Sequence, residues 1–184
     1  NRHKKVFNTY QAIPEFCFGC YKVQIEPENL IDLIKTYLIF DNIEFENNNT
    51  RKCMVETRPK INGHYKALIY CSSLEEAENL KKQIEKIFFK NLGKEVKINV
   101  KRGCTEYGAK YPQYKNLKEN VMSYVTDWKK YESLIDDNFP DLIVDNNIKP
   151  TINGVTLNDA MTIQNWLKYG LLIGDETCKD IKSY

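Results

Sequence analysis

Apolar and polar residues alternate in a stretch that begins near residue 21. Tyr21, Val23 and Ile25 are separated by polar residues, which is the period of a strand with one buried face. Over residues 28–40 the apolar positions recur at helical spacing instead, so we expect a helix there. Pro27 suits the first turn of this helix because its missing N–H needs no partner.

The same succession of patterns follows further along the chain. Three more strand-like runs are expected, at residues 52–58, 65–72 and 96–101. The first two of these form a hairpin through the turn at 61–64. Ser73 and Glu76 form a capping box for a second amphipathic helix, which ends at Gly93.

The order strand, helix, strand, strand, helix, strand predicts the fold class. It is the split unit of a ferredoxin-like fold, so we expect an α+β, ferredoxin-like βαββαβ sandwich over residues 17–104. In this fold a four-stranded antiparallel sheet has its first and third strands in the centre and both helices on one face. Residues 1–16 are expected to form an irregular N-terminal arm.

The pattern changes after this unit. Residues 105–184 are expected to be a helical extension packed on the core, with one helix over 121–139 and a linker over 141–155. A last helix is predicted to begin at a cap formed by Thr156 and Asp159.

Four runs of the chain carry a resemblance: FCFGCYKVQ at 16–24, NNTRKCM at 48–54, LIYCSSLEEA at 68–77 and KRGCTEY at 101–107. Together they resemble an uncharacterised bacterial family that is sometimes found beside tetratricopeptide repeats. The resemblance covers most of the chain through the final helix. It implies a protein-associated role, with protein as the expected partner, and brings no activity or site assignment.

Charge and hydropathy narrow the function classes. The 27 basic and 25 acidic side chains give a net charge of +2, so overall charge does not predict binding to nucleic acid or to an anionic membrane. No stretch approaches the roughly 20 apolar residues of a membrane span, and no signal peptide follows the basic start. We therefore expect a cytoplasmic protein with no membrane partner, whose six cysteines are thiols or metal ligands.

The pair Cys17 and Cys20, separated by two residues, is the short motif with the clearest chemical meaning. In the predicted topology the first strand begins where the fourth ends, which brings Cys104 to this pair. We also expect the hairpin to place His64 at the same edge of the sheet. Three thiolates and one imidazole are a complete tetrahedral set for Zn²⁺, so the sequence predicts a structural zinc site.

Two other interpretations of these cysteines stay open. Free cysteine is among the most buried residue types, so Cys17 and Cys20 can be inert core residues. They can also form a redox pair, although the first cysteine of a thioredoxin-type pair begins a helix and this pair precedes a strand. Cys53 and Cys71 are expected at the opposite edge, facing each other across the hairpin, and are left out of the zinc set.

Two further surfaces are candidates for binding. A small pocket for a carboxylate or phosphate is expected at Arg58, Arg102 and Tyr107. A basic sheet face that could bind single-stranded nucleic acid is expected at Lys22, Lys97 and Lys101. The first strand offers this face no aromatic residue for base stacking, and charged strand positions commonly just face water.

No nucleophile triad, phosphate-binding glycine loop or zinc-hydrolase helix motif is present in the sequence. We therefore expect a non-catalytic binding or accessory domain, with zinc as its cofactor. The alternatives are a small redox enzyme that uses the Cys17/Cys20 pair and a single-stranded nucleic-acid binder. The sequence predicts no oligomeric state.

Overall fold

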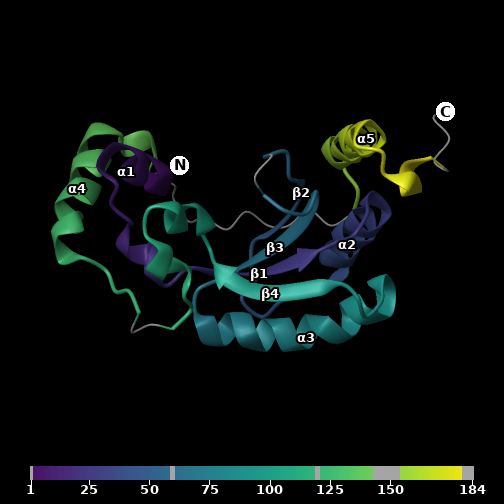
Figure 1. The fold of residues 1–184 in the computed structure, drawn as a ribbon, viewed down its shortest axis with the longest axis horizontal. Coiled ribbons are helices and arrows are strands. Elements are labelled where there is room, and N and C mark those ends of the chain that lie inside the picture. The colour runs from purple at the N-terminus through teal and green to yellow at the C-terminus, as the bar shows by residue number, and fades with distance from the viewer. Residues whose placement is uncertain (1, 59–60, 119–120, 143–153, 180–184) are drawn as a thin grey trace.

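A four-stranded antiparallel sheet forms the centre of the computed structural model, which describes residues 2–58, 61–118, 121–142 and 154–179 (Figure 1). Its strands are β1 (Tyr21–Glu26), β2 (Arg51–Val55), β3 (Tyr65–Cys71) and β4 (Lys97–Arg102). They lie in the order β2-β3-β1-β4, and each neighbouring pair is antiparallel. The expected α+β class, with the first and third strands in the centre, is confirmed.

Two helices pack on one face of this sheet, α2 (Leu30–Asn42) and α3 (Leu74–Leu92). The alternation in β1 directs Val23 and Ile25 into the interface, where both are fully buried with Ile69 of β3. Ile84 and Phe88 of α3 belong to the same core.

Both helices start at caps that the sequence specifies. Asn29 caps α2 by accepting a hydrogen bond from the Asp32 N–H at 2.9 Å. Ser73 caps α3 by accepting from the Glu76 N–H at 3.0 Å. These caps satisfy N–H groups that the first helical turn leaves without partners.

The carboxylate of Glu76 also holds the loop before β2. It accepts hydrogen bonds from the Asn47 and Asn49 side chains at 3.0 and 2.7 Å, and from the Ser72 N–H and hydroxyl at 2.6 and 2.7 Å. Burial favours the neutral acid, but these donors prevail and lower the pKa of Glu76 to about 2.

We expect Glu76→Gln to lower the free energy of unfolding by about 1–2 kcal/mol at neutral pH, because the variant loses charge-assisted hydrogen bonds. The folded-state pKa lies below that of the unfolded chain, so this stability is present above about pH 4.3 and is lost as the pH falls towards about 2. Urea titrations at several pH values measure the effect. Glu75→Gln, at the exposed neighbouring position, is the control, and an equal loss there would contradict the assignment.

The N-terminal segment differs from the expected irregular arm, because Arg2–Tyr10 forms the helix α1. This helix packs on α4 (Lys129–Asn138), where Val6 and Ile135 are buried together. Arg2 donates to Glu132 at 3.0 Å and to Asp136 at 2.8 Å. The expectation was wrong because the partner that stabilises α1 lies more than a hundred residues away in the sequence.

The helix expected over 121–139 is shorter in the structure. Val125 is extended, a 3-10 turn spans Thr126–Trp128, and α4 follows. Most of the linker expected over 141–155 lies outside the described residues. Short 3-10 helices in the described residues are η1 (Glu15–Phe18), η2 (Thr105–Ala109), η3 (Pro112–Lys115), η4 (Thr126–Trp128), η5 (Pro140–Leu142) and η6 (Glu176–Cys178).

The last helix, α5 (Leu157–Leu172), begins at the predicted cap of Thr156 and Asp159. Trp166 anchors it against α2 by packing with Leu30 and Leu33, on the side of the molecule away from α1 and α4 (Figure 1). Of the helices in the described ranges, none is both long and apolar enough to cross a membrane.

Candidate functional site

The thiols gather at the end of the sheet where β1 begins. Tyr21 of β1 lies opposite Arg102 of β4 on one side and opposite Cys71 of β3 on the other. The Gly103 N–H donates to the Cys20 carbonyl at 2.8 Å and extends the ladder by one more position. Cys17, Cys20 and Cys104 therefore share one end of the sheet, as the topology predicted, and we call these three residues the thiol cluster.

His64 does not belong to this end, so its assignment to the zinc set was wrong. It precedes β3, and the start of β3 lies beside the end of β1, where Ala67 is opposite Ile25. Its ring packs near Tyr169, with Nδ1 3.5 Å from the tyrosine hydroxyl. Because β1 and β3 are antiparallel, the turn that precedes β3 lies beside the end of β1 and not beside its start.

The same register corrects the placement of two other cysteines. Cys71 lies opposite Tyr21 and belongs to the end with the thiol cluster, whereas Cys53 lies opposite Ala67. They do not face each other across the hairpin.

Cys17 sits in η1 and is fully buried. Its sulfur lies 3.8 Å from the hydroxyl oxygen of Tyr107, and its carbonyl accepts a hydrogen bond from the Tyr114 hydroxyl at 2.8 Å. Ile13 completes this small core. Cys17 is therefore held by packing on all sides and has no route to solvent of its own.

Cys104 follows β4, packs against the same core and is only half-buried. A hydrogen bond with the Cys17 thiol lowers the pKa of Cys104 to about 5, burial opposes this shift, and His3 of α1 lowers the pKa further. The pKa of Cys17 is raised, first by the hydrogen bond with Cys104 and then by burial. The two shifts have opposite directions, and the thiol whose pKa is lowered is the one on the less buried sulfur.

Cys20 lies against the backbone of residue 103. A Cβ on Gly103 would stand 2.3 Å from the Cys20 sulfur, so only glycine allows this approach. Burial raises the pKa of Cys20 to about 11, and the nearby charge of Cys104 adds to the shift. Lys22 donates to the Gly103 carbonyl at 2.9 Å, and burial lowers the pKa of its ammonium group.

A metal ion finds no ready ligand group in this part of the chain. Throughout residues 2–58, 61–118, 121–142 and 154–179, no three side chains of His, Cys, Asp or Glu are grouped as a metal ion requires. All six cysteines are free thiols. The imidazole that acts on Cys104 belongs to His3, which was not among the predicted ligands because residues 1–16 were expected to be irregular and His64 was placed at this end instead.

The three residues expected to bind an anion are not brought together. Arg102 is 2% exposed and lies on the core side of β4, where it donates to the Phe18 carbonyl at 2.6 Å and to the Tyr21 hydroxyl at 2.7 Å. Arg58 pairs with Glu56 at 2.6 Å beyond the far end of β2. Tyr107 is buried beside Cys17. Arg102 therefore links β4 to the chain at the start of β1 and is not placed to bind a ligand.

The lysines of the other sheet face are partly neutralised within the chain. Lys22 lies opposite Lys101, whose ammonium group is 3.3 Å from Glu26, and Lys97 is exposed at the edge. Tyr70 is the residue opposite Lys22 on β3. Of these three lysines, Lys101 has a carboxylate partner among the described residues, and nucleic-acid binding by this face stays a prediction.

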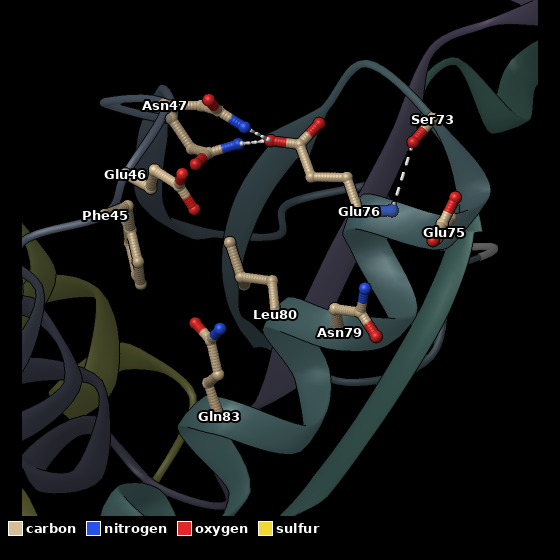
Figure 2. A pocket seen from close by; sticks show the side chains of 10 residues that line it. Phe45, Glu46, Asn47, Ser73, Glu75, Glu76, Asn79, Leu80 and Gln83 are labelled. Atoms are coloured by element: carbon tan, nitrogen blue, oxygen red, sulfur yellow. Dashed lines mark hydrogen bonds between the residues drawn. The ribbon is translucent and has the colours of Figure 1, made fainter.

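A separate hollow of about 330 Å³ lies between the Asn47 loop and the start of α3 (Figure 2). Figure 2 shows that the side chain of Glu76, one of the lining residues, points toward the loop, where hydrogen bonds from the loop amides meet it. The loop amides and Ser72 already supply the Glu76 carboxylate with hydrogen-bond donors. We therefore assign the carboxylate a role in holding the loop at the start of α3.

No family model matches the chain, and no match was found among curated proteins or among solved structures.

Proposed function

We propose that the fold is ferredoxin-like. The order of strands and helices, the central positions of β1 and β3 and the packing of α2 and α3 on one face support this classification. A fold of this type hosts many functions, so the function must be argued from the site.

We propose that the protein performs thiol–disulfide exchange with Cys104 and Cys17 as its reactive pair. The observation that carries this proposal is the meeting of Cys17, Cys104, Tyr107 and His3 from separate chain segments at one end of the sheet. Cys104 is half-buried and its pKa is lowered, whereas Cys17 is fully buried and its pKa is raised. A more accessible thiol with a lowered pKa, which attacks, and a buried resolving thiol are the two components that a dithiol site needs.

The proposed reaction consumes one external disulfide. The Cys104 thiolate attacks one sulfur of R–S–S–R, forms a mixed disulfide and releases RS⁻. The Cys17 thiol then gives its proton to the released RS⁻ and attacks the Cys104 sulfur, which forms the Cys17–Cys104 disulfide and releases the second RS⁻. The two protein sulfurs are oxidised and the external disulfide is reduced to two thiols.

This assignment replaces the Cys17/Cys20 pair that the sequence suggested. With its pKa raised to about 11, Cys20 is almost entirely protonated near neutral pH and is a poor attacking group. Cys17 and Cys20 also belong to different surroundings, one in the buried core and one against Gly103.

The test is to treat the reduced protein with hydroxyethyl disulfide and to map disulfides by peptide mass spectrometry. We expect a Cys17–Cys104 disulfide in the wild-type protein and in Cys20→Ser. In Cys17→Ser the reaction should stop at a mixed disulfide on Cys104, because the resolving thiol is missing. A first mixed disulfide on Cys20, or a Cys17–Cys20 disulfide, would contradict the proposal.

A non-catalytic accessory domain with a structural zinc site is the second candidate. The contact of His3 with Cys104, beside Cys17, favours it, although the described donors are not grouped around one point. Elemental analysis of the purified protein distinguishes the two functions. About one zinc per chain, lost in both Cys104→Ser and His3→Ala, would support the zinc site and count against a free dithiol.

A further inference from the structure

A small cavity opens at the same end of the sheet as the thiol cluster. Its volume is about 330 Å³, at the lower end of the range for small-molecule pockets. It is lined by Phe16, Gly19, Cys20, Thr50, Tyr70, Cys71 and Ser72. None of these lining residues carries a formal charge, and burial raises the pKa of the Cys20 and Cys71 thiols to about 11 and 12. The cavity therefore favours a neutral, largely apolar group.

Two contacts connect the cavity to the proposed reactive pair. The ring of Phe16 packs edge-on against His3, with centroids 5.8 Å apart, and His3 acts on Cys104. The sulfur of Cys20 lies over Gly103, the residue directly before Cys104.

The walls of the cavity suit an aromatic ring. Phe16 is 52% exposed, and its side chain lines the same space as the half-buried Tyr70. Aromatic side chains in such positions bind planar groups by edge-to-face and stacked contacts.

We propose that this cavity binds a neutral aromatic group of the disulfide substrate and presents its sulfur to Cys104. The inference rests on the proposed function. It identifies the substrate class as a small, uncharged aromatic disulfide, Ar–S–S–Ar. The Cys104 thiolate attacks one sulfur and releases ArS⁻, the cavity holds the ring of the remaining half, and Cys17 then displaces that half as a second ArS⁻ with loss of its own proton.

The experiment compares two neutral disulfides, dithiodipyridine and hydroxyethyl disulfide. The second-order rate constant of each with Cys104 is measured by stopped flow and mass spectrometry, and their ratio is taken for every variant. We expect Phe16→Ser and Tyr70→Ser each to lower the ratio of aromatic to aliphatic rate about fivefold, because the ring loses one wall. Phe16 is a neighbour of His3, so its replacement changes the surroundings of the group that acts on Cys104. A change in the intrinsic reactivity of Cys104 affects both rate constants and cancels in their ratio.

Phe139→Ser is the matched control, since Phe139 is another exposed phenylalanine, 41% exposed, outside the cavity. Its ratio should equal that of the wild-type protein. An unchanged ratio in both Phe16→Ser and Tyr70→Ser would overturn the cavity assignment alone. If the wild-type Cys104 reacts with neither disulfide, the proposed function fails and the substrate assignment fails with it.

Discussion

Cys104→Ser is expected to remove most of the alkylation of the protein by iodoacetamide at about pH 6. A free cysteine is almost fully protonated at this pH, whereas a thiol with a pKa of about 5 is almost fully ionised. The gain in thiolate is about 300-fold, and the lower nucleophilicity of a stabilised thiolate reduces it to roughly tenfold. We therefore expect the total rate to fall about tenfold or more in the variant.

The pH dependence of the same reaction gives the sharper measurement. In the wild-type protein the rate at Cys104, followed by mass spectrometry of the modified peptide, should be half-maximal near pH 5 and should level off above it. Cys17→Ala should move this midpoint to higher pH, because the variant lacks the hydrogen-bond donor that lowers the pKa of Cys104 most.

Cys53→Ser is the matched control for these experiments. Burial raises the pKa of Cys53 to about 12, and its position in β2 lies away from the thiol cluster. The rate of alkylation at Cys104 should therefore be the same in this variant as in the wild-type protein. A wild-type midpoint near pH 8.5, the value of a free cysteine, would show that Cys104 has no stabilised thiolate.

Asp175→Ala is expected to lower the free energy of unfolding by about 2–4 kcal/mol. The carboxylate of Asp175 accepts hydrogen bonds from the Leu30 N–H at 2.7 Å and from the Tyr65 hydroxyl at 2.5 Å. It also accepts from the N–H and hydroxyl of Thr177 at 2.9 and 2.6 Å. Alanine would leave the hydroxyl of Tyr65, a residue that is 2% exposed, and the first N–H of α2 without partners.

The loss should be largest in the C-terminal part of the chain, because Asp175 ties the segment after α5 to the start of α2. Urea unfolding measures the total change, and limited proteolysis should show earlier cleavage after α5 in the variant. Glu176→Ala is the control, since that side chain is 77% exposed and, within the described residues, pairs with Lys179 alone. Equal losses in the two variants would show that the hydrogen bonds of Asp175 do not stabilise the fold.

The elements of the sheet unit could be predicted because their signals are local. The alternation in β1 and the caps at Ser73 and Thr156 each specify a structure within a few residues. The helix α1 could not be predicted in this way. Its stability comes from Glu132 and Asp136 of α4, which no local pattern connects to Arg2.

The candidate site was predicted only in part, for a geometric reason. The convergence of Cys17, Cys20 and Cys104 follows from the antiparallel pairing of β1 with β4. The error at His64 arose because the hairpin was placed at the wrong end of β1, which the register of β1 with β3 excludes. The uneven protonation of Cys17 and Cys104 depends on which sulfur is buried, and a sequence pattern does not specify that difference.

The packing of α1 on α4 has a consequence for how the protein is made. The hydrogen bonds of Arg2 to α4 hold the helix that carries His3, so both ends of this 130-residue interval must have left the ribosome before His3 is fixed beside Cys104. Closing so long an interval is a late event in folding. During synthesis Cys104 therefore lacks the part of its pKa shift that His3 contributes, whereas the larger part, from Cys17, depends on the pairing of β1 with β4.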